Sequence, residues 1–162
     1  MSYPLNSKLV TIAIPAYKST YLFDAIGSAL NQSYSNIELV IVNDHSPFDI
    51  KSIINKFDDS RIRYYENNTN LGKKSIVHNW NRCLEYANGD YFVLLCDDDV
   101  LMTNFVSPLL TLAEKYPNCN VFHGRRKLID ERTGEEYDEA PWPEYEQSED
   151  FIRNCFNGLR KH

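Results

Sequence analysis

The chain alternates between two hydrophobic patterns over its first two thirds. Short runs rich in β-branched and aromatic residues predict strands, and stretches with apolar residues at helical spacing predict helices between them. The predicted strands cover residues 9–14, 37–42, 61–66 and 91–95, and the predicted helices lie within 22–30, 50–57, 76–87 and 105–113. Strands without apolar/polar alternation that are separated by helices are typical of a parallel sheet covered on both faces. The pattern therefore predicts an α/β fold.

Local signals place the ends of several of these elements. Pro15 is expected to stop the first strand, and Ser46-Pro47 offers an N-cap and first-turn pair for the second helix. Residues 70–74 are expected to open the third helix, and Asn88-Gly89 to end it. One face of that helix is marked by its apolar positions, which are Ile76, Val77, Trp80, Leu84 and Ala87.

The pattern changes after about residue 119. Residues 119–124 are compatible with a further strand, and residues 127–134 suggest a hairpin. The segment 130–150 is strongly acidic, so a loop or flap is expected there, followed by a short helix around 148–157.

Composition and charge narrow the class of protein. The 162 residues are 43% hydrophobic and 25% charged, which suits one domain with a full core. A net charge of −6 argues against a nucleic-acid binder, which would carry a basic patch. No apolar run approaches the roughly 20 residues that span a bilayer, and the N-terminus lacks the layout of a signal peptide. We therefore expect a cytoplasmic protein with reduced cysteines, and peripheral association with a membrane stays open.

Three polar or aromatic segments directly follow predicted strands. They are Pro15-Ala16-Tyr17, Asn43-Asp44-His45-Ser46 and Asp97-Asp98-Asp99. Because ligands of open parallel sheets bind beyond the carboxyl ends of the strands, these segments are expected to share one rim. The three aspartates repel one another unless a cation neutralises them, and Mg²⁺ and Mn²⁺ prefer carboxylate oxygens that are often shared with a substrate's phosphates. The acid cluster therefore suggests a metal-assisted reaction on a phosphorylated ligand.

Each candidate also has a purely structural interpretation. The aspartates of 97–99 could cap a following helix, and Asp44 could form an Asx turn instead of accepting hydrogen bonds from a nucleobase or ribose. Tyr17 is either a base-stacking ring or a structural residue of the rim. Gly72 and Lys73 suit a phosphate or ribose contact, although lysines are usually only solvated. The joint position of the segments is a stronger signal than any one of them.

Five segments in register resemble the family 2 glycosyltransferases, whose GT-A fold binds nucleotide sugars. They are residues 10–17 (VTIAIPAY), 29–34 (ALNQSY), 38–46 (ELVIVNDHS), 70–72 (NLG) and 87–91 (ANGDY), the last leading into Asp97-Asp98-Asp99. Order and spacing agree over about residues 9–130. The resemblance implies a single GT-A domain with a mostly parallel sheet. Its nucleotide-sugar-binding core would cover residues 1–130, and an acidic loop or flap with a short C-terminal helix would cover 131–162.

The resemblance implies roles for residues on the rim. The three residues after the first strand would wall the nucleotide base, and Asp44 would read it. Asp98 would hold a divalent cation, Mn²⁺ or Mg²⁺, on the donor diphosphate, and Asp97 would face the ribose or the metal shell. The residues implied to bind the donor nucleotide are therefore Pro15, Ala16, Tyr17, Asp44, Gly72, Lys73 and Asp97.

Two positions depart from the family pattern. Cys96 occupies the motif position that often holds a first aspartate in the family. Trp80 stands where the family often has an arginine, in the helix before the fourth strand. Both departures are compatible with a different donor preference.

The implied reaction is inverting transfer of a sugar from a nucleoside-diphosphate sugar to the hydroxyl of a saccharide or lipid-linked saccharide, as in polysaccharide biosynthesis. A divalent cation stabilises the leaving diphosphate, and a carboxylate base activates the hydroxyl. The family usually takes that base from a segment beyond the sheet core, and this chain is expected to end before it. No catalytic residue is therefore assigned. The alternative is a nucleotide-binding module, or a catalytically incomplete relative, that binds nucleotide without turnover.

Two other enzyme classes fit less well. Phosphotransferases of the haloacid-dehalogenase type place a nucleophilic aspartate after the first strand, where this chain has Pro15-Ala16-Tyr17. Dinucleotide-dependent oxidoreductases carry GxGxxG after that strand, and no such motif follows residues 9–14.

Overall fold

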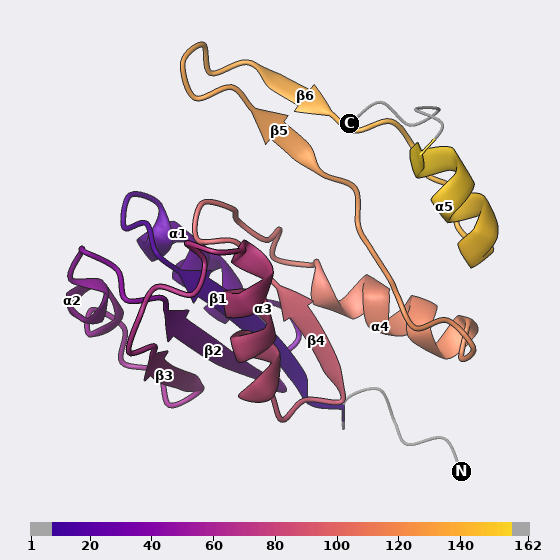
Figure 1. Ribbon diagram of the computed structural model, residues 1–162. Helices are drawn as coiled ribbons and strands as arrows, with labels where there is room; N and C mark the ends of the chain where they lie inside the picture. The colour runs from indigo at the N-terminus through magenta and orange to yellow at the C-terminus, as the bar shows by residue number, and fades with distance from the viewer. Residues whose placement is uncertain (1–7, 157–162) are drawn as a thin grey trace. The chain divides into compact units, whose positions relative to one another are not determined.

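The computed structural model describes residues 8–156 and divides the chain into two compact units, one up to Asn120 and one from Val121 onward (Figure 1). The first unit holds a four-stranded parallel sheet in the order β3-β2-β1-β4. Its strands are β1 (Val10–Ala16), β2 (Ile37–Asn43), β3 (Ile62–Glu66) and β4 (Tyr91–Leu94), and its helices are α1 (Leu22–Leu30), α2 (Ile50–Ile54), α3 (Ile76–Glu85) and α4 (Val106–Lys115). The predicted parallel α/β fold is confirmed. Within the described residues, no helix has both the length and the apolar character needed to cross a membrane.

Both faces of the sheet are covered by helices, as its continuous apolar strands predict. On one face, side chains of β1 and β2 such as Ile12 and Leu39 pack with residues of α1, α2 and α4 in the larger hydrophobic cluster. On the other face lies α3 (Figure 1), where Cys83 packs in a smaller cluster with Val40. Burial raises the pKa of the Cys83 thiol to about 12, so it stays protonated at neutral pH and serves as a small apolar residue.

The strand register brings the polar segments to one edge of the sheet. Ala16 of β1 pairs with Asn43 of β2, which pairs with Glu66 of β3, so these three strands end level. β4 is shorter, and its last residue, Leu94, pairs with Ala13. The residues that follow the four strands therefore lie along the carboxyl edge of the sheet, where ligands of open parallel sheets bind.

Contrary to the prediction, Pro15 does not stop the first strand, because β1 continues through it to Ala16. In a β-strand, the N–H and C=O groups of every second residue face the same neighbouring strand. The Ala13 carbonyl accepts a hydrogen bond from Leu95 N, so the backbone groups of Ala13 face β4. The nitrogen of Pro15 faces that same side, beyond the last residue pair of β4. Its missing N–H therefore removes no hydrogen bond from the sheet.

The second helix begins where its apolar spacing predicts, at residue 50, but the predicted cap at Ser46-Pro47 is wrong. α2 starts at Ile50, and Asp49 caps it by accepting a hydrogen bond from the Ser52 backbone N–H at 3.0 Å. The hydroxyl of Ser46, the predicted cap, instead donates to the Tyr17 carbonyl oxygen at 2.6 Å. Ser46 thus joins the segments that follow β1 and β2.

Residues 70–74 do not open the third helix as predicted, and most of its apolar residues do not face the core. α3 starts at Ile76, so residues 70–74 form a turn before it. Its buried residues are Asn79 and Cys83, whereas Ile76 and Leu84 are 58% and 55% exposed. On the buried face, Asn79 accepts a hydrogen bond from Asn67 Nδ2 at 2.9 Å, and Cys83 packs with Val40.

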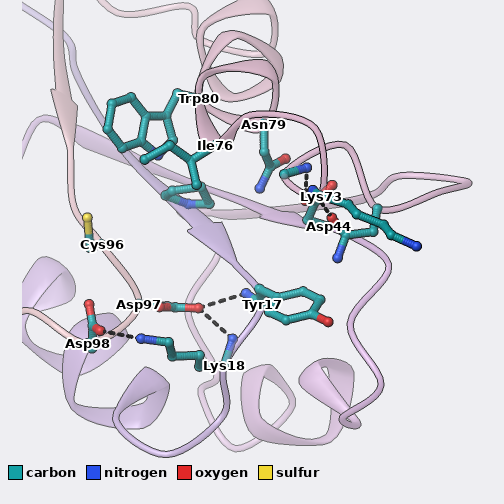
Figure 2. Close-up of a pocket in the computed structure, with 13 residues that line it drawn as sticks. Tyr17, Lys18, Asp44, Lys73, Ile76, Asn79, Trp80, Cys96, Asp97 and Asp98 are labelled. Atoms are coloured by element: carbon teal, nitrogen blue, oxygen red, sulfur yellow. Dashed lines mark hydrogen bonds and ion pairs between the residues drawn. The ribbon is translucent and has the colours of Figure 1, made fainter.

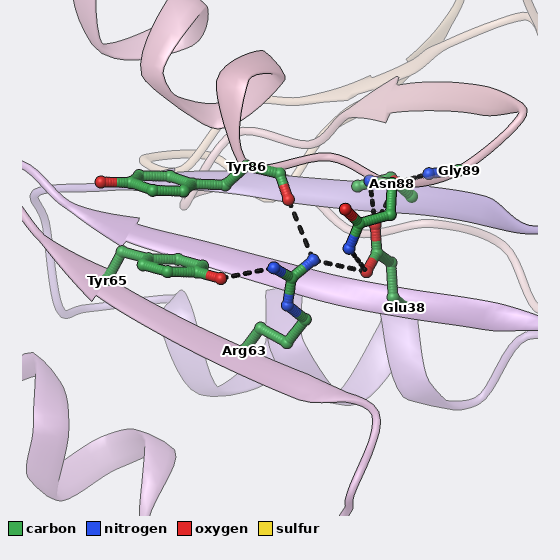
Figure 3. Close-up of polar contacts among 7 residues, drawn as sticks. Glu38, Arg63, Tyr65, Tyr86, Asn88 and Gly89 are labelled. Carbon is green, nitrogen blue, oxygen red and sulfur yellow. Dashed lines mark hydrogen bonds and ion pairs between the residues drawn. The ribbon is translucent and has the colours of Figure 1, made fainter.

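A buried carboxylate near the opposite edge of the sheet fixes the approach to β4 (Figure 3). Glu38 of β2 accepts hydrogen bonds from the Thr11 hydroxyl and the Asn88 backbone N–H, both at 2.6 Å. The Gly89 N–H donates to the Thr11 hydroxyl oxygen at 2.9 Å, and a Cβ on Gly89 would lie 2.6 Å from Thr11 N. These contacts hold the start of β4 against β1. They thereby also position the acid run, Asp97-Asp98-Asp99, which follows β4.

The second unit consists of a hairpin and a helix. β5 (Lys127–Ile129) pairs antiparallel with β6 (Glu136–Asp138), and Gly134 in the connecting turn has a φ of 71°. α5 (Ser148–Phe156) follows, so the predicted hairpin and terminal helix are confirmed. The predicted strand at 119–124 is wrong. That segment pairs with no strand of the described chain, and a strand without a neighbour has no hydrogen-bond ladder to join.

Candidate functional site

A pocket of about 630 Å³ lies at the carboxyl edge of the sheet (Figure 2). Its lining comes from the segments that follow β1, β2 and β4, from the turn before α3 and from α3 itself. The lining residues are Pro15, Tyr17, Lys18, Asp44, Asn70, Gly72, Lys73, Ile76, Asn79, Trp80, Cys96, Asp97 and Asp98. Carboxylates, lysines and aromatic rings therefore share one cavity.

The pocket gathers nearly all of the residues predicted to bind donor or metal. Ala16 is the exception, because its side chain is fully buried in the hydrophobic core and does not line the cavity. Lys18 and Asn79 line it without having been predicted. Lys18 directly follows Tyr17 in the sequence, so its position was a usable signal. Asn79 lies outside the apolar positions that mark its helix, so no sequence pattern indicated it.

Asp44 holds the turn before α3 in place. Its Oδ1 accepts hydrogen bonds from Asn67 Nδ2 and from the Leu71 backbone N–H, both at 2.8 Å. Its Oδ2 accepts the Gly72 backbone N–H at 2.7 Å, and a Cβ on Gly72 would lie only 2.8 Å from that oxygen. A carboxylate offers about four acceptor positions, so these three contacts leave Oδ2 with one position for a ligand.

The same carboxylate orients two buried amides. Asp44 can only accept, so the amide nitrogen of Asn67 faces it and donates its second N–H to Asn79 Oδ1 at 2.9 Å. Nδ2 of Asn79 then points toward the pocket (Figure 2). It has no hydrogen-bond partner among residues 8–156, although Asn79 is only 4% exposed. A buried N–H₂ group without a partner on a pocket wall is a donor suited to an acceptor atom of a ligand.

Asp97 ties the end of β4 to the residues after β1. Its Oδ2 accepts the backbone N–H groups of Tyr17 at 2.7 Å and of Lys18 at 2.6 Å, and the residue is buried. Tyr17 lines the pocket and is 40% exposed, so its side chain is accessible to a ligand. Asp97 therefore positions the residues on which the Tyr17 ring and the Lys18 side chain are carried.

Asp98 has a cation beside it. The Lys18 ammonium lies 2.8 Å from Asp98 Oδ2. The hydrogen bond and the negative charge of Asp98 raise the pKa of Lys18, so the lysine is charged at neutral pH. On its other side Asp98 neighbours Cys96 and Asp99, and the potential ligand atoms of these three residues all lie within 4.8 Å of one another.

The carboxylates of this group suit a hard divalent cation, because Mg²⁺ and Mn²⁺ prefer such oxygens. The thiol does not. Burial, followed by the charges of the neighbouring aspartates, raises the pKa of Cys96 to about 11, so it stays protonated at neutral pH. A metal ion would therefore be held through Asp98 and Asp99. The alternative that these aspartates cap the next helix is wrong, since α4 begins at Val106.

Comparison with known families decides the assignment of the chain. The profile described as "Glycosyl transferase family 2" matches residues 11–161. The chain belongs to this family. The match spans every residue that lines the pocket, so the pocket is part of the glycosyltransferase domain.

Curated relatives of this glycosyltransferase carry matching names. An uncharacterized glycosyltransferase of Rickettsia prowazekii is 31% identical over 147 residues, which cover 90% of this chain and 45% of the relative. The Escherichia coli UDP-Glc:alpha-D-GlcNAc-diphosphoundecaprenol beta-1,3-glucosyltransferase WfaP is 40% identical over 102 residues, which cover 62% of this chain and 39% of the relative. The chain spans less than half the length of both.

Solved structures share the fold of this glycosyltransferase. TarS 1-349 of S. aureus in complex with UDP-GlcNAc matches with a TM-score of 0.58 at 20% identity, over 68% of this chain and 32% of that one. The mannosyltransferase PcManGT of Pyrobaculum calidifontis in complex with GDP-Man and Mn²⁺ matches with a TM-score of 0.54 at 21% identity, over 66% and 32%. These likenesses confirm the predicted GT-A fold.

Proposed function

We propose that this glycosyltransferase binds a nucleoside-diphosphate sugar in the pocket and transfers the sugar to an acceptor hydroxyl with inversion, assisted by a divalent cation. One observation carries the proposal. A single cavity of about 630 Å³ gathers the polar segments that follow β1, β2 and β4, together with the start of α3. That volume suits a ligand of nucleotide size. The UDP-GlcNAc and GDP-Man complexes of the two structural neighbours support a donor of this class.

The base of the donor would lie between the Tyr17 ring and the side of the pocket formed by Asp44 and Asn79. Tyr17 offers an aromatic ring for stacking, and Pro15 lines the same pocket. Asp44 Oδ2 retains an acceptor position for an N–H group, and Asn79 Nδ2 supplies a donor for a carbonyl oxygen. This pairing suits bases in which an N–H stands next to a carbonyl, as in uracil, thymine and guanine.

The diphosphate would lie between the turn before α3 and the acid run. Lys73 on that turn brings positive charge to the same cavity. Asp98, with Asp99 beside it, would hold the cation, and Asp97 would face the ribose or the metal shell. When bound, the cation acts as a Lewis acid that stabilises the charge on the leaving nucleoside diphosphate. The Mn²⁺ of the PcManGT complex supports this choice of ion.

The acceptor and the stereochemistry are proposed from the relatives. The printed name of WfaP pairs UDP-glucose with a diphosphoundecaprenol-linked saccharide and a β-1,3 product. UDP-glucose is an α-glycoside, so a β product requires inversion. We propose the same outcome here, with a saccharide or lipid-linked saccharide as acceptor. A carboxylate base would remove the acceptor proton, and we assign it to no residue within 8–156.

Thermal unfolding tests the donor and metal site directly. The melting temperature of the purified chain would be measured with UDP, GDP and dTDP, each with and without Mn²⁺. Stabilisation that needs both a diphosphate nucleotide and the metal is expected, because each ligand completes the site of the other. Asp98→Asn should abolish the metal-dependent part. The control variant Asp58→Asn, an exposed carboxylate after α2, should retain it. A shift produced by metal alone and indifferent to nucleotide would count against the proposal.

Binding without turnover is the second candidate, because no carboxylate base is assigned within residues 8–156. It predicts the same thermal stabilisation by nucleotide and Mn²⁺ but no release of nucleoside diphosphate from UDP-glucose or GDP-mannose when a saccharide acceptor is supplied. Metal-dependent sugar transfer by the purified chain would exclude this candidate.

A further inference from the structure

Lys18 is the residue of the pocket that the proposed function leaves without a defined role. Its ammonium lies 2.8 Å from Asp98 Oδ2, an oxygen of the carboxylate proposed to hold the metal. We infer that Lys18 is a built-in counter-ion that competes with the divalent cation for Asp98, and that it thereby couples metal binding to diphosphate binding. This inference rests on the proposed function and adds a positioning residue to it.

The backbone of Lys18 is fixed at the acid run independently of its side chain. Asp97 Oδ2 accepts the N–H groups of both Tyr17 and Lys18, at 2.7 Å and 2.6 Å, and Asp97 is buried. The Lys18 side chain therefore starts from a fixed point next to the acid run and reaches the neighbouring aspartate (Figure 2). Anchoring the backbone lowers the entropy lost when the ion pair forms.

The acid run needs such a cation when no metal is bound. Asp98 and Asp99 are adjacent in sequence, and their oxygens, with the Cys96 sulfur, lie within 4.8 Å of one another. Like charges at this spacing repel each other, and the Lys18 ammonium offsets the repulsion through Asp98. A metal ion on Asp98 carries the same sign of charge as the ammonium 2.8 Å from Oδ2, so the two cations repel each other and the lysine is expected to move away as the metal enters.

The Lys18–Asp98 ion pair is exposed to solvent, which favours replacement of the lysine by a metal ion. The Lys18 side chain is 64% exposed and that of Asp98 is 42% exposed. Exposed ion pairs are weak and screened by salt, whereas a divalent ion carries twice the charge. The lysine therefore lowers the affinity of the metal without blocking the site.

The displaced ammonium remains in the cavity, which Lys18 itself lines. A nucleoside diphosphate brings negative charge to that cavity, so it offers the lysine a new partner once the metal has taken Asp98. The metal then binds more tightly in the presence of the nucleotide, and the nucleotide more tightly in the presence of the metal, by the same factor. Lys18 would thus make occupancy of the site by metal depend more strongly on the presence of the donor.

Calorimetric titration of three purified proteins, each with the 162-residue sequence or one substitution in it, tests the inference. Mn²⁺ would be titrated into wild type, Lys18→Met and Lys51→Met, each alone and in the presence of UDP, and the series repeated with GDP. Lys51 is exposed on α2, does not line the cavity and has no ion pair among residues 8–156, so its variant controls for the general loss of one positive charge. Lys18→Met should bind Mn²⁺ alone about twofold to fivefold more tightly than wild type, as expected for removal of an exposed competing ion pair. Lys51→Met should differ from wild type by less than about 1.5-fold.

The coupling gives a second readout. The factor by which UDP or GDP tightens Mn²⁺ binding should be smaller in Lys18→Met than in wild type, and unfolding curves should show that the exposed substitution leaves the fold intact. Manganese binding that is equal in Lys18→Met and wild type, with the nucleotide effect intact in both, would overturn the inference and leave the proposed function standing. Absence of any manganese or nucleotide binding in all three proteins would overturn both.

Discussion

Arg63 on β3 and Glu38 on β2 form an ion pair across neighbouring strands, with Arg63 Nη1 at 2.7 Å from Glu38 Oε2 (Figure 3). The same guanidinium nitrogen donates to the Tyr86 carbonyl oxygen at 2.9 Å, at the end of α3. The Glu38 side chain is only 10% exposed, against 34% for Arg63. Because Glu38 also accepts hydrogen bonds from Thr11 and Asn88, one buried charge joins three strands and the approach to β4.

Replacing Glu38 with alanine should destabilise the protein by about 2–4 kcal/mol, because its hydrogen-bond donors and the Arg63 charge would lose their acceptor. Urea unfolding followed by circular dichroism measures the loss. Glu85→Ala is the matched control, since it breaks the more exposed pair with Arg82 on α3 and should cost less than about 0.5 kcal/mol. Similar losses in the two variants would show that Glu38 has no special structural role.

The same carboxylate predicts a dependence of stability on pH. Burial alone would raise the pKa of Glu38, but hydrogen bonds from its three neighbours outweigh burial and hold the pKa below its ordinary value. A carboxylate of this kind stabilises the fold above its unfolded pKa, about 4.3, and this contribution is lost as the pH falls through the folded pKa.

We therefore expect the free energy of unfolding to fall as the pH drops below about 5. Glu38→Gln should show a shallower fall, measured as urea midpoints across the acid range. Some slope should remain, because the pKa values of Asp59 and Asp90 are also lowered, in both cases first by the hydrogen bond with their basic partner. An unchanged slope in Glu38→Gln would contradict the assignment.

His45, directly after Asp44, has a φ of 52°, in the left-handed region that favours glycine. His45→Gly should keep the free energy of unfolding within about 1 kcal/mol of wild type, because relief of the backbone strain offsets the added freedom of the unfolded chain. His45→Val should lose about 1–2 kcal/mol, since a β-branched residue fits this conformation poorly. Thermal unfolding of the two variants measures the difference, and equal stability of both would show that the backbone is not strained there.

Asn79→Ala should weaken the binding of UDP or GDP by about tenfold in the presence of Mn²⁺, because it removes the buried donor on the pocket wall. Calorimetry measures the affinity, and unfolding curves verify that the variant is folded. Asn81→Ala, an exposed amide on the same helix, should bind within about twofold of wild type. Nucleotide affinity that is equal in Asn79→Ala and wild type would remove Asn79 from the site.

The fold was predictable because its elements depend on local properties. The β-branched runs that form β1 and β2 are buried on both faces, and the rule for parallel sheets then places the segments after them at one edge. The orientation of α3 was not predictable in this way. The face that α3 buries holds Asn79 and Cys83, and the partner of Asn79 is Asn67, which lies 12 positions earlier in the segment after β3.

In the candidate site, too, some residues could be predicted from local sequence patterns and others could not. Tyr17, Asp44 and the acid run were found because each directly follows a strand. The pairing of Lys18 with Asp98 joins residues 80 positions apart, and no local pattern announces it. Such a contact depends on the register of β1 against β4, which only the folded chain defines.

Gly72 closes on Asp44 so tightly that any Cβ would collide with Oδ2 at 2.8 Å. A saturation library selected for nucleotide retention would therefore favour glycine at position 72, although its side chain is a single hydrogen atom. Intolerance at this position would reflect crowding of the main chain against the Asp44 carboxylate rather than the loss of a functional group.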